Sequence, residues 1–353
     1  MTDVLRVGIV GAGGYTGSEL LRLCQGHPRL SVEFVAARDN AGKALGDVLP
    51  SVLGVPELAG RVLESFEPEQ ARNLAGRIDV AFTALPHAAS AKVAAALWQQ
   101  GIQVIDLSAD YRLRDAEVYE RTYGPHPHPE LLETAVYGLV ELHRDALRGA
   151  RLIAAPGCYP TSAILPLAPL LANQLVELEG IIIDAKSGVS GAGRKPLPST
   201  HFSECSEGLR PYKVAGAHRH TPEIEQELGR LAGAPLQVVF TPNLCPMTRG
   251  ILAVAYARAK PSTTLAQCVE AARQMFGSTL VHVLEEALPD TLWVRGSACA
   301  HVAYRIDERT RTVLAMCTLD NLAKGASSQA LQALNAARGW DDALGLPRIA
   351  MFP

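Results

Sequence analysis

Short apolar blocks alternate with helix-forming segments over the first half of the chain. Residues 5–10 form a continuous apolar run, and a glycine-rich turn at 11–17 and a helix at 18–24 follow it. The same pattern predicts strands at 32–37, 78–84 and 104–107 and an alanine-rich helix at 87–100. Strands that alternate with helices predict an α/β domain with a doubly wound parallel sheet of the Rossmann type.

The pattern changes after about residue 158. Apolar segments rich in β-forming residues occur at 181–185, 238–241, 251–259, 300–306 and 313–319, with one helix near 264–276. They predict a second, α+β domain with a mixed sheet. A helix at 321–338 is expected to return to the first domain. We therefore assign 1–157 to the Rossmann domain, completed by a C-terminal helical segment 320–353, and 158–319 to the α+β domain.

Composition and charge narrow the classes of partner. The 353 residues are 48% hydrophobic and 20% charged, with a net charge of -3 and no run of like charges. Such a chain offers no basic surface to nucleic acid or to an anionic membrane, so we expect a small-molecule partner. The sequence shows neither a signal-peptide pattern nor an apolar stretch of membrane-spanning length, and we expect a cytoplasmic protein.

The number and spacing of the cysteines indicate whether the protein forms disulfides or binds a structural metal. The seven cysteines are scattered, odd in number and never spaced as Cys-x-x-Cys, which argues against a disulfide framework and a structural zinc site. We expect no metal. Most of them are expected to be small core residues.

The first glycine-rich turn predicts a dinucleotide site. Gly11, Gly14 and Gly17 follow a strand and open a helix, where the backbone can approach a pyrophosphate at the positive helix end. Thr16 occupies the third glycine position of the usual fingerprint, so a plain tight turn is the alternative. Arg38 ends the second strand where NAD-specific enzymes place an acid, and it suits the 2′-phosphate of NADP.

Cys158 is the candidate nucleophile. It stands between a Pro-Gly turn and a Pro-Thr pair, directly before the apolar helix expected at 162–171. A sulfur at a helix N-terminus is favoured as thiolate. On these residues alone, a packed core thiol remains an equal alternative.

Two histidines are candidate proton carriers. His218 and His220 precede a helix for which Thr221 is the expected N-cap and Pro222 the first helical residue. Alternate residues of an extended segment point to opposite sides, so we expect the two histidines to have different roles. A loop histidine that only packs is the alternative for either one.

Two further segments carry polar groups past strand ends. Arg112, in the run 106–112, can hold a phosphate in a bidentate contact, and a surface ion pair with Asp110 or Asp115 is the alternative. The glycine-rich and serine-bearing loop 186–194 can place backbone amides near a substrate or nicotinamide, or it is a mobile hairpin.

Six segments together closely resemble N-acetyl-gamma-glutamyl-phosphate reductases, in the same order over nearly the whole chain. They are 11–20 (GAGGYTGSEL), 106–112 (DLSADYR), 156–161 (PGCYPT), 186–194 (KSGVSGAGR), 218–225 (HRHTPEIE) and 320–326 (DNLAKGA). Gly13 stands where the family commonly has Ala or Ser. This combination is more specific than any single motif.

The resemblance implies NADPH-dependent reduction of N-acetylglutamyl 5-phosphate to the 5-semialdehyde, with release of phosphate, in arginine biosynthesis. It implies a homodimer or homotetramer with a fold shared with aspartate-semialdehyde dehydrogenases, Cys158 as nucleophile and His218 or His220 as acid/base. The implied substrate-binding residues are Ser108, Arg112, Lys186 and Arg194. The expected NADP(H)-binding residues are Gly11, Gly13, Gly14, Tyr15, Thr16, Gly17, Arg38, Pro86, Ser187, Gly188, Asn321, Lys324 and Gly325.

Three other functions compete with this interpretation. The first is the homologous aminoadipyl-phosphate reductase of lysine biosynthesis, whose substrate is one methylene longer; one methylene is worth only about 1–3 kcal/mol. The second is a non-catalytic dinucleotide-binding sensor with an inert Cys158. The third is a Cys-His hydrolase or acyltransferase without redox chemistry, against which the glycine loop argues.

Overall fold

The computed structural model describes residues 4–353, and the chain divides into two compact units. The first unit comprises Met1–Pro156 and Ala326–Leu346, and the second comprises Gly157–Gly325 and Pro347–Pro353. The end of the chain therefore differs from the predicted helical segment 320–353. Residues 347–353 form no helix and belong to the second unit, where the Met351 N–H donates to the Arg295 carbonyl at 2.8 Å. The functional domain division stays a prediction.

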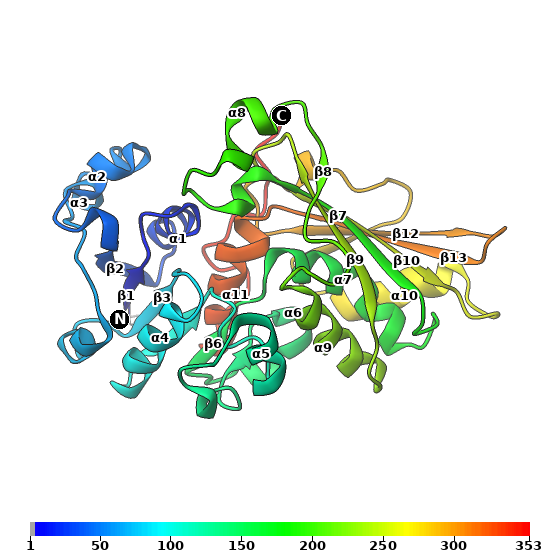
Figure 1. Ribbon diagram of the computed structural model, residues 1–353, viewed down its shortest axis with the longest axis horizontal. Coiled ribbons are helices and arrows are strands. Elements are labelled where there is room, and N and C mark those ends of the chain that lie inside the picture. Colours follow the sequence, from blue (N-terminus) through cyan, green and yellow to red (C-terminus); the bar gives the residue numbers. More distant parts are fainter. Residues whose placement is uncertain (1–3) are drawn as a thin grey trace. The chain divides into compact units, whose positions relative to one another are not determined.

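The first unit contains a six-stranded sheet whose strand order is β2-β1-β3-β4-β6-β5 (Figure 1). Every strand pair in it is parallel, which confirms the predicted Rossmann-type sheet. The strands are β1 (Leu5–Val10), β2 (Leu30–Ala36), β3 (Val80–Thr83), β4 (Gln103–Asp106), β5 (Val136–Tyr137) and β6 (Leu152–Ala154). The helices are α1 (Tyr15–Gln25), α2 (Leu45–Val48), α3 (Pro56–Ala59), α4 (Ala89–Gln99), α5 (Ala116–Tyr123), α6 (Val140–Leu147) and α11 (Ser328–Ala337).

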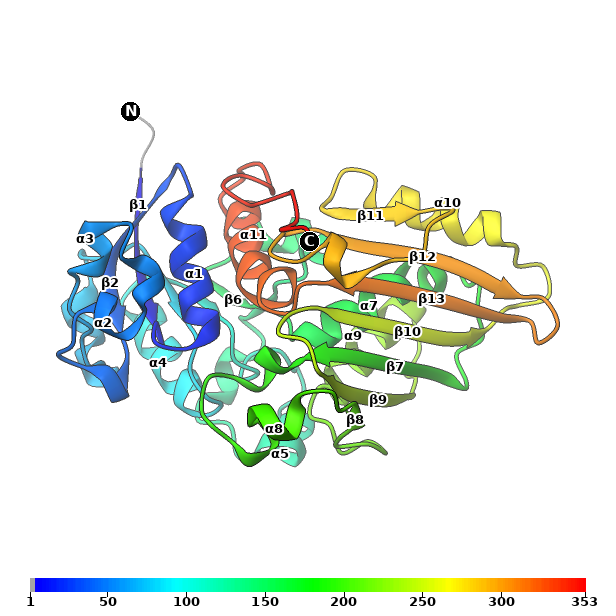
Figure 2. The ribbon, with the colours of Figure 1, turned by 90° about the horizontal axis from the view of Figure 1, so that it is seen from above.

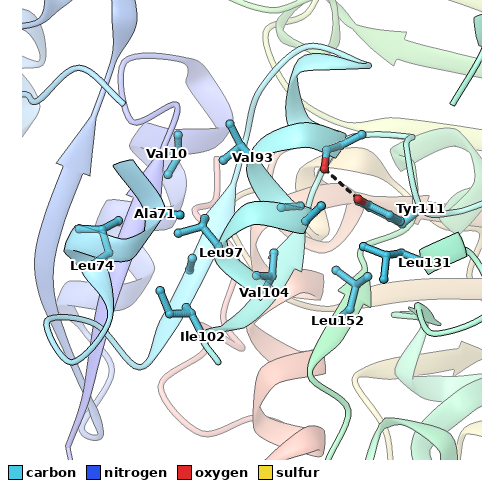
Figure 3. Close-up of a cluster of buried hydrophobic side chains, with 14 of the residues drawn as sticks. Val10, Ala71, Leu74, Val93, Leu97, Ile102, Val104, Tyr111, Leu131 and Leu152 are labelled. Carbon is cyan, nitrogen blue, oxygen red and sulfur yellow. Dashed lines mark hydrogen bonds between the residues drawn. The ribbon is translucent and has the colours of Figure 1, made fainter. Parts of the chain in front are cut away.

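A continuous apolar core fixes this sheet against its helices (Figure 3). Val104 of β4 and Leu97 of α4 are fully buried in it, as the apolar runs predicted for both elements require. Tyr111 lies in the same cluster, and its hydroxyl donates to the Ala91 carbonyl at 2.8 Å. The core thus reaches the loop that follows β4, so this loop has a fixed backbone.

The second unit contains a seven-stranded mixed sheet with the order β11-β12-β13-β10-β7-β9-β8 (Figure 2). Pairs β11·β12 and β7·β9 are parallel and the others antiparallel, as the prediction of a mixed sheet requires. The strands are β7 (Ile181–Gly188), β8 (Arg210–Pro211), β9 (Val238–Cys245), β10 (Ile251–Arg258), β11 (Val281–Leu284), β12 (Ala300–Asp307) and β13 (Thr312–Leu319). The helices are α7 (Cys158–Ala172), α8 (Phe202–Cys205), α9 (Thr221–Ala232) and α10 (Leu265–Phe276).

Helices α7, α9 and α10 pack on one face of this sheet (Figures 1 and 2). Strand β10 shows the alternation that this arrangement requires. Its odd-numbered alanines, such as Ala253 and Ala255, are fully buried. Leu252, Val254 and Tyr256 project from the opposite face and are half-buried. Along β10, this second face is apolar.

Two helix starts differ from their predicted positions. Helix α7 begins at Cys158 instead of residue 162, because Pro160 falls in the first turn, where backbone N–H groups need no helical partner. Helix α11 begins at Ser328 instead of 321, because a π-helical turn, η8 (Ala323–Ser327), precedes it. Turns of this kind are frequent at functional sites.

Three absences hold for residues 4–353. No helix there has both the length and the apolarity that crossing a bilayer requires. This part of the chain also holds no group of three or more His, Cys, Asp or Glu side chains placed to bind a metal ion. None of its cysteines is joined in a disulfide.

Candidate active site

The glycine loop of the first unit is packed backbone against backbone. Gly11 has φ +98°, and a Cβ there would lie 2.3 Å from the Ala84 carbonyl oxygen. A Cβ at Gly17 would lie 2.3 Å from the Gly11 oxygen. Helix α1 starts after Gly14, which has no side chain to cap it, and its first turn has no acidic residue. The loop therefore leaves a positive helix end open to an anion, which fits a dinucleotide phosphate.

Gly17→Ala tests how tightly this loop is built. We expect the added methyl group to destabilise the protein by roughly 1–3 kcal/mol and to weaken NADPH binding, because only backbone atoms surround it. Gly14→Ala is the matched control for stability, since its Cβ would have Gly11 O at 3.7 Å as its nearest neighbour. Thermal unfolding compares the two variants, and an equal loss of stability in both would contradict the packing argument. NADPH titration measures the loss of binding in Gly17→Ala.

The segment after β2 lies beside this loop. A Cβ at Gly13 would be 3.3 Å from the Ala37 Cβ and 3.6 Å from the Asn40 side-chain nitrogen. Arg38 begins the short helix η1 (Arg38–Asn40), and its side chain is 85% exposed with Nε 3.8 Å from a Glu67 carboxylate oxygen. An exposed surface ion pair is weak, so the Arg38 guanidinium can turn to a ligand.

Three other predicted cofactor residues also lie in the first unit. Tyr15, the first residue of α1, is 41% exposed. The carbonyl of Thr16 accepts a hydrogen bond from the Ser327 hydroxyl at 3.1 Å. Pro86 follows β3, and its carbonyl accepts from the Ser90 N–H at 3.1 Å, which starts helix α4. Thr16 and Pro86 thus have backbone roles within their own unit.

Arg112 is buried. Only 7% of it is accessible; its Nε donates to the Ala155 carbonyl at 2.7 Å and its Nη2 to the Leu107 carbonyl at 2.8 Å. The loop turns inward here because its neighbour Tyr111 packs in the core. Two guanidinium donors therefore hold the protein's own backbone.

Ser108 belongs to a buried polar cluster around Asp106. Its hydroxyl donates to an Asp106 carboxylate oxygen at 2.5 Å, and the Thr83 and Ser90 hydroxyls donate to the other at 2.6 and 2.5 Å. Burial raises the pKa of Asp106, the Asp110 carboxylate adds to this, and the three hydroxyls oppose it. The hydroxyl proton of Ser108 is therefore used in a hydrogen bond to Asp106.

Cys158 is the first residue of helix α7. Gly157 caps this helix with extended backbone and no side chain. The Gly157 N–H donates to a carboxylate oxygen of Glu223 at 2.9 Å, across 66 residues of sequence. Glu223 is 1% exposed. The sulfur-bearing residue thus lies at a helix N-terminus, as predicted, and a buried carboxylate holds the peptide group before it.

Gly325 packs directly on Cys158. A Cβ at position 325 would lie 2.8 Å from the Cys158 Cβ and 3.2 Å from its Cα. Only a residue without a side chain fits there. The position that the sequence assigned to the cofactor thus also contacts the candidate nucleophile.

The two histidines lie side by side, which an extended segment would not allow, and their different roles stay a prediction. Their ring centroids are 4.8 Å apart. The segment is not extended, because His220 has helical backbone angles and itself occupies the N-cap position of α9. Thr221 is therefore the first helical residue and not the cap, and its buried hydroxyl oxygen makes no hydrogen bond.

Tyr159 joins the histidines to the rest of the site. Its ring lies edge-on to His218 and His220, at centroid distances of 5.5 and 6.2 Å. The Tyr159 hydroxyl donates to the Asn243 carbonyl at 3.1 Å and accepts from the Tyr212 hydroxyl at 3.3 Å. Sequence reasoning missed both tyrosines, although Tyr159 directly follows Cys158.

Burial sets the charge states of this group. It lowers the pKa of His218 to about 4, and the positive charges of Lys213 and Arg219 add to the effect, so His218 is neutral at pH 7. The His220 backbone N–H donates to His218 Nδ1 at 3.1 Å, which leaves the proton of the neutral ring on Nε2. Burial also raises the pKa of Tyr212 to about 12, so its hydroxyl stays protonated.

Lys186 and Ser187 alternate on strand β7. Lys186 pairs with Asp184 at 2.5 Å on the sheet face opposite to the one that α7 covers. Ser187 points to the α7 face and is 2% exposed. The structure therefore does not bring Lys186 to the side of the sheet where Cys158 lies, because residues 186 and 187 of a strand face opposite ways.

The loop after β7 is anchored, which argues against the mobile hairpin. The N–H groups of Gly188, Val189 and Ser190 donate to carbonyls of residues 247–250. A Cβ at Gly188 would lie 2.8 Å from the Thr248 oxygen, so the two segments meet backbone to backbone. Arg194 lies further along this loop and is exposed.

Asn321 and Lys324 are buried at the end of β13. The Asn321 amide donates to the Ser190 hydroxyl at 2.9 Å, and its oxygen accepts from the Gly250 N–H at 2.8 Å. Through these two hydrogen bonds, Asn321 holds the loop after β7 in place. Lys324 is fully buried, and its charge opposes the rise that burial causes in the pKa of Cys317.

Both halves of the chain match known protein families. Residues 6–150 match the family described as semialdehyde dehydrogenase, NAD binding domain, and residues 158–321 match semialdehyde dehydrogenase, dimerisation domain. A protein of Geotalea daltonii named N-acetyl-gamma-glutamyl-phosphate reductase is 48% identical over 352 residues, covering 99% of this chain and 100% of the relative. A protein of that name from Symbiobacterium thermophilum is 48% identical over 345 residues and covers 97% of each chain.

Solved structures share the fold. Aspartate semialdehyde dehydrogenase II of Vibrio cholerae, complexed with ASA, superposes with a TM-score of 0.70 at 17% identity, covering 95% of this chain and 98% of that one. Aspartate semialdehyde dehydrogenase of Candida albicans, solved with NADP, superposes with a TM-score of 0.65 at 16% identity. The match covers 95% of this chain and 100% of that one. At these identities the likeness concerns the fold alone.

Proposed function

This chain belongs to the N-acetyl-gamma-glutamyl-phosphate reductase family, and on that premise we propose the reaction that it catalyses. It reduces N-acetyl-L-glutamyl 5-phosphate with NADPH to N-acetyl-L-glutamate 5-semialdehyde and phosphate, a step of arginine biosynthesis. The observation that carries the proposal is the position of Cys158 in the first turn of α7, fixed by Glu223 and next to the Tyr159–histidine group.

The chain's residues divide the chemistry among them. The Cys158 thiolate attacks the acyl carbon, the bond from that carbon to the phosphate oxygen breaks, and a thioester forms as phosphate leaves. NADPH, when bound, supplies the hydride that turns the thioester into a hemithioacetal. Collapse of the hemithioacetal frees the aldehyde and returns the sulfur of Cys158 as thiolate. A thioester accepts hydride more readily than a carboxylate, which is what the covalent step achieves.

We assign the two histidines different proton roles. His218 is a weak base, because its pKa is lowered to about 4 and its Nδ1 already accepts the His220 N–H. It can still donate a hydrogen bond from Nε2. His220 is therefore the residue that takes the thiol proton of Cys158 before the attack and returns a proton to that sulfur when the hemithioacetal oxyanion collapses to the aldehyde.

The cofactor and phosphate sites are assigned from the loops. The backbone around Gly11, Gly14 and Gly17 fits the NADPH pyrophosphate, and Arg38 faces the 2′-phosphate. Of the basic residues expected at the substrate, Arg194 is exposed, whereas Arg112 is buried and Lys186 is half-buried beside Asp184. Because it is the most accessible of the three, Arg194 is the first candidate for the substrate phosphate, and Arg112 shapes the loop after β4.

We also propose a homodimer or homotetramer in the cytoplasm. The match to a dimerisation domain over 158–321 supports an oligomer, and the apolar outer face around Val254 and Tyr256 offers it a surface. The absence of disulfides among the cysteines of the described chain is typical of proteins in a reducing compartment.

NADPH oxidation tests the proposed function. We expect absorbance of NADPH to fall when N-acetylglutamyl phosphate is added, and kcat/KM to be roughly tenfold or more lower with the aminoadipyl homologue. No oxidation would leave the sensor or the hydrolase as the better function. Faster turnover of the longer substrate would assign the chain to the lysine-type reaction.

A further inference from the structure

Asp320 forms the centre of a buried network at the end of β13. It is fully buried, and one carboxylate oxygen accepts the N–H groups of Leu322 and Ala323 at 2.8 and 3.0 Å. The other oxygen accepts the Gly296 N–H at 2.7 Å and lies 3.3 Å from Nη1 of Arg249. One carboxylate therefore ties together three separate segments of the second unit.

The network leads directly to the π-helical turn η8. Ala323, which donates to the carboxylate, is the first residue of this turn. The backbone carbonyl of Asp320 accepts the Gly325 N–H at 2.8 Å. The side chain and the backbone of Asp320 therefore both hold the turn. A π-helical turn is less favourable than an α-helical one and persists only where its surroundings fix it.

The same turn limits where Cys158 can lie. Gly325 approaches so closely that a methyl group there would lie 2.8 Å from the Cys158 Cβ. A shift of the turn by a few tenths of an ångström therefore either collides with Cys158 or opens a gap beside it. Close packing of this kind transmits small displacements.

From these contacts we propose that Asp320 is a positioning residue for Cys158. Its carboxylate fixes η8 against Arg249 and Gly296, and η8, through Gly325, fixes the nucleophile at the start of α7. The inference rests on the proposed function only in that it takes Cys158 as the reacting group. Misplacement of a reacting group by about 1 Å can cost about 100-fold in rate, so such a support matters to catalysis.

Asp320→Asn tests the proposal, because it keeps the shape and removes one acceptor atom and the charge. The amide nitrogen can no longer accept both the Gly296 N–H and the Arg249 guanidinium. A second variant, Arg249→Met, leaves the three backbone bonds of Asp320 in place and serves if Asp320→Asn does not fold. The matched control is Asp342→Asn, which removes a similarly buried carboxylate paired with Arg144 at 2.7 Å in the first unit.

The readout is alkylation of Cys158 by iodoacetamide over pH 5–9, quantified on the peptide that contains Cys158, together with kcat. We expect Asp320→Asn to slow alkylation at pH 7, because the sulfur is displaced from the helix N-terminus, and to lower kcat by about tenfold or more. Arg249→Met should act in the same direction with a smaller effect. The control should change thermal stability while leaving the alkylation profile as in the wild type.

Two results would overturn the proposal. One is that Asp320→Asn folds and keeps the alkylation profile and kcat of the wild type. If Asp320→Asn does not fold, the same result for Arg249→Met counts against the proposal. The other is an equal change of the profile in Asp342→Asn, which would reveal a general loss of stability. Alkylation needs no turnover, so a wild-type protein that fails to oxidise NADPH refutes the proposed function without deciding the role of Asp320.

Discussion

Replacing Cys158 with serine is expected to abolish reductase turnover while leaving NADPH binding nearly unchanged. A hydroxyl is a far poorer nucleophile than a thiolate at a helix N-terminus, and loss of a nucleophile costs about 10⁴-fold or more in kcat. Binding should persist because the glycine loop around Gly11 and Gly17 belongs to the first unit and Cys158 to the second. NADPH oxidation and direct titration of NADPH measure the two effects separately.

The control for this variant is Cys205→Ser. Cys205 is also half-buried and lies in the second unit, in the short helix α8, but it has no place in the proposed chemistry. Its variant should keep wild-type turnover. Substantial reductase activity in Cys158→Ser would show that the thioester route is wrong, whatever the control does.

His220→Ala is expected to lower kcat by about 10²-fold to 10⁴-fold, the usual size of a general acid/base contribution. His218→Ala should act mainly on KM, because a histidine with a pKa near 4 and an occupied Nδ1 orients groups better than it moves protons. Steady-state kinetics of both variants measure the difference. The opposite assignment, with kcat lost in His218→Ala alone, would contradict this division.

The burial of His218 also predicts how the free energy of unfolding changes in acid. Its folded pKa, about 4, lies below the value of 6.5 for an unperturbed histidine. Between these values the unfolded chain binds a proton that the folded chain does not, so stability falls as pH falls from 6.5 towards 4 and is fully present above 6.5. His218→Gln cannot titrate and should lose less stability over this interval. Denaturant unfolding at pH 7 and pH 5 measures the change, and equal losses in both proteins would contradict burial as the cause.

The elements predicted most fully from sequence are those built from local pattern. The run 5–10, the glycine turn and the helix behind it form the strand, loop and α1 that we expected, because apolar periodicity and glycine conformation are local properties. The prediction for Cys158 also rested on local signals, a Pro-Gly turn before an apolar helix. Cys158 indeed begins α7.

What the sequence could not predict depends on long-range contacts. Glu223 lies in the first turn of α9, and its carboxylate accepts the Gly157 N–H across 66 residues of sequence. The contact of Gly325 with Cys158 and the burial of Arg112 likewise depend on how distant segments pack. The placement of the two histidines has a local cause, because a single residue, His220, adopts helical angles and bends a segment that was expected to be extended.

The most direct test of the account is to trap the covalent intermediate. The wild-type protein is incubated with N-acetylglutamyl phosphate in the absence of NADPH, quenched in acid and digested. We predict release of phosphate together with an N-acetylglutamyl group on the peptide that contains Cys158, removable by hydroxylamine or by later addition of NADPH before the quench. Release of phosphate without any acyl group on Cys158, or an acyl group on another residue that NADPH turns over, would contradict the thioester mechanism.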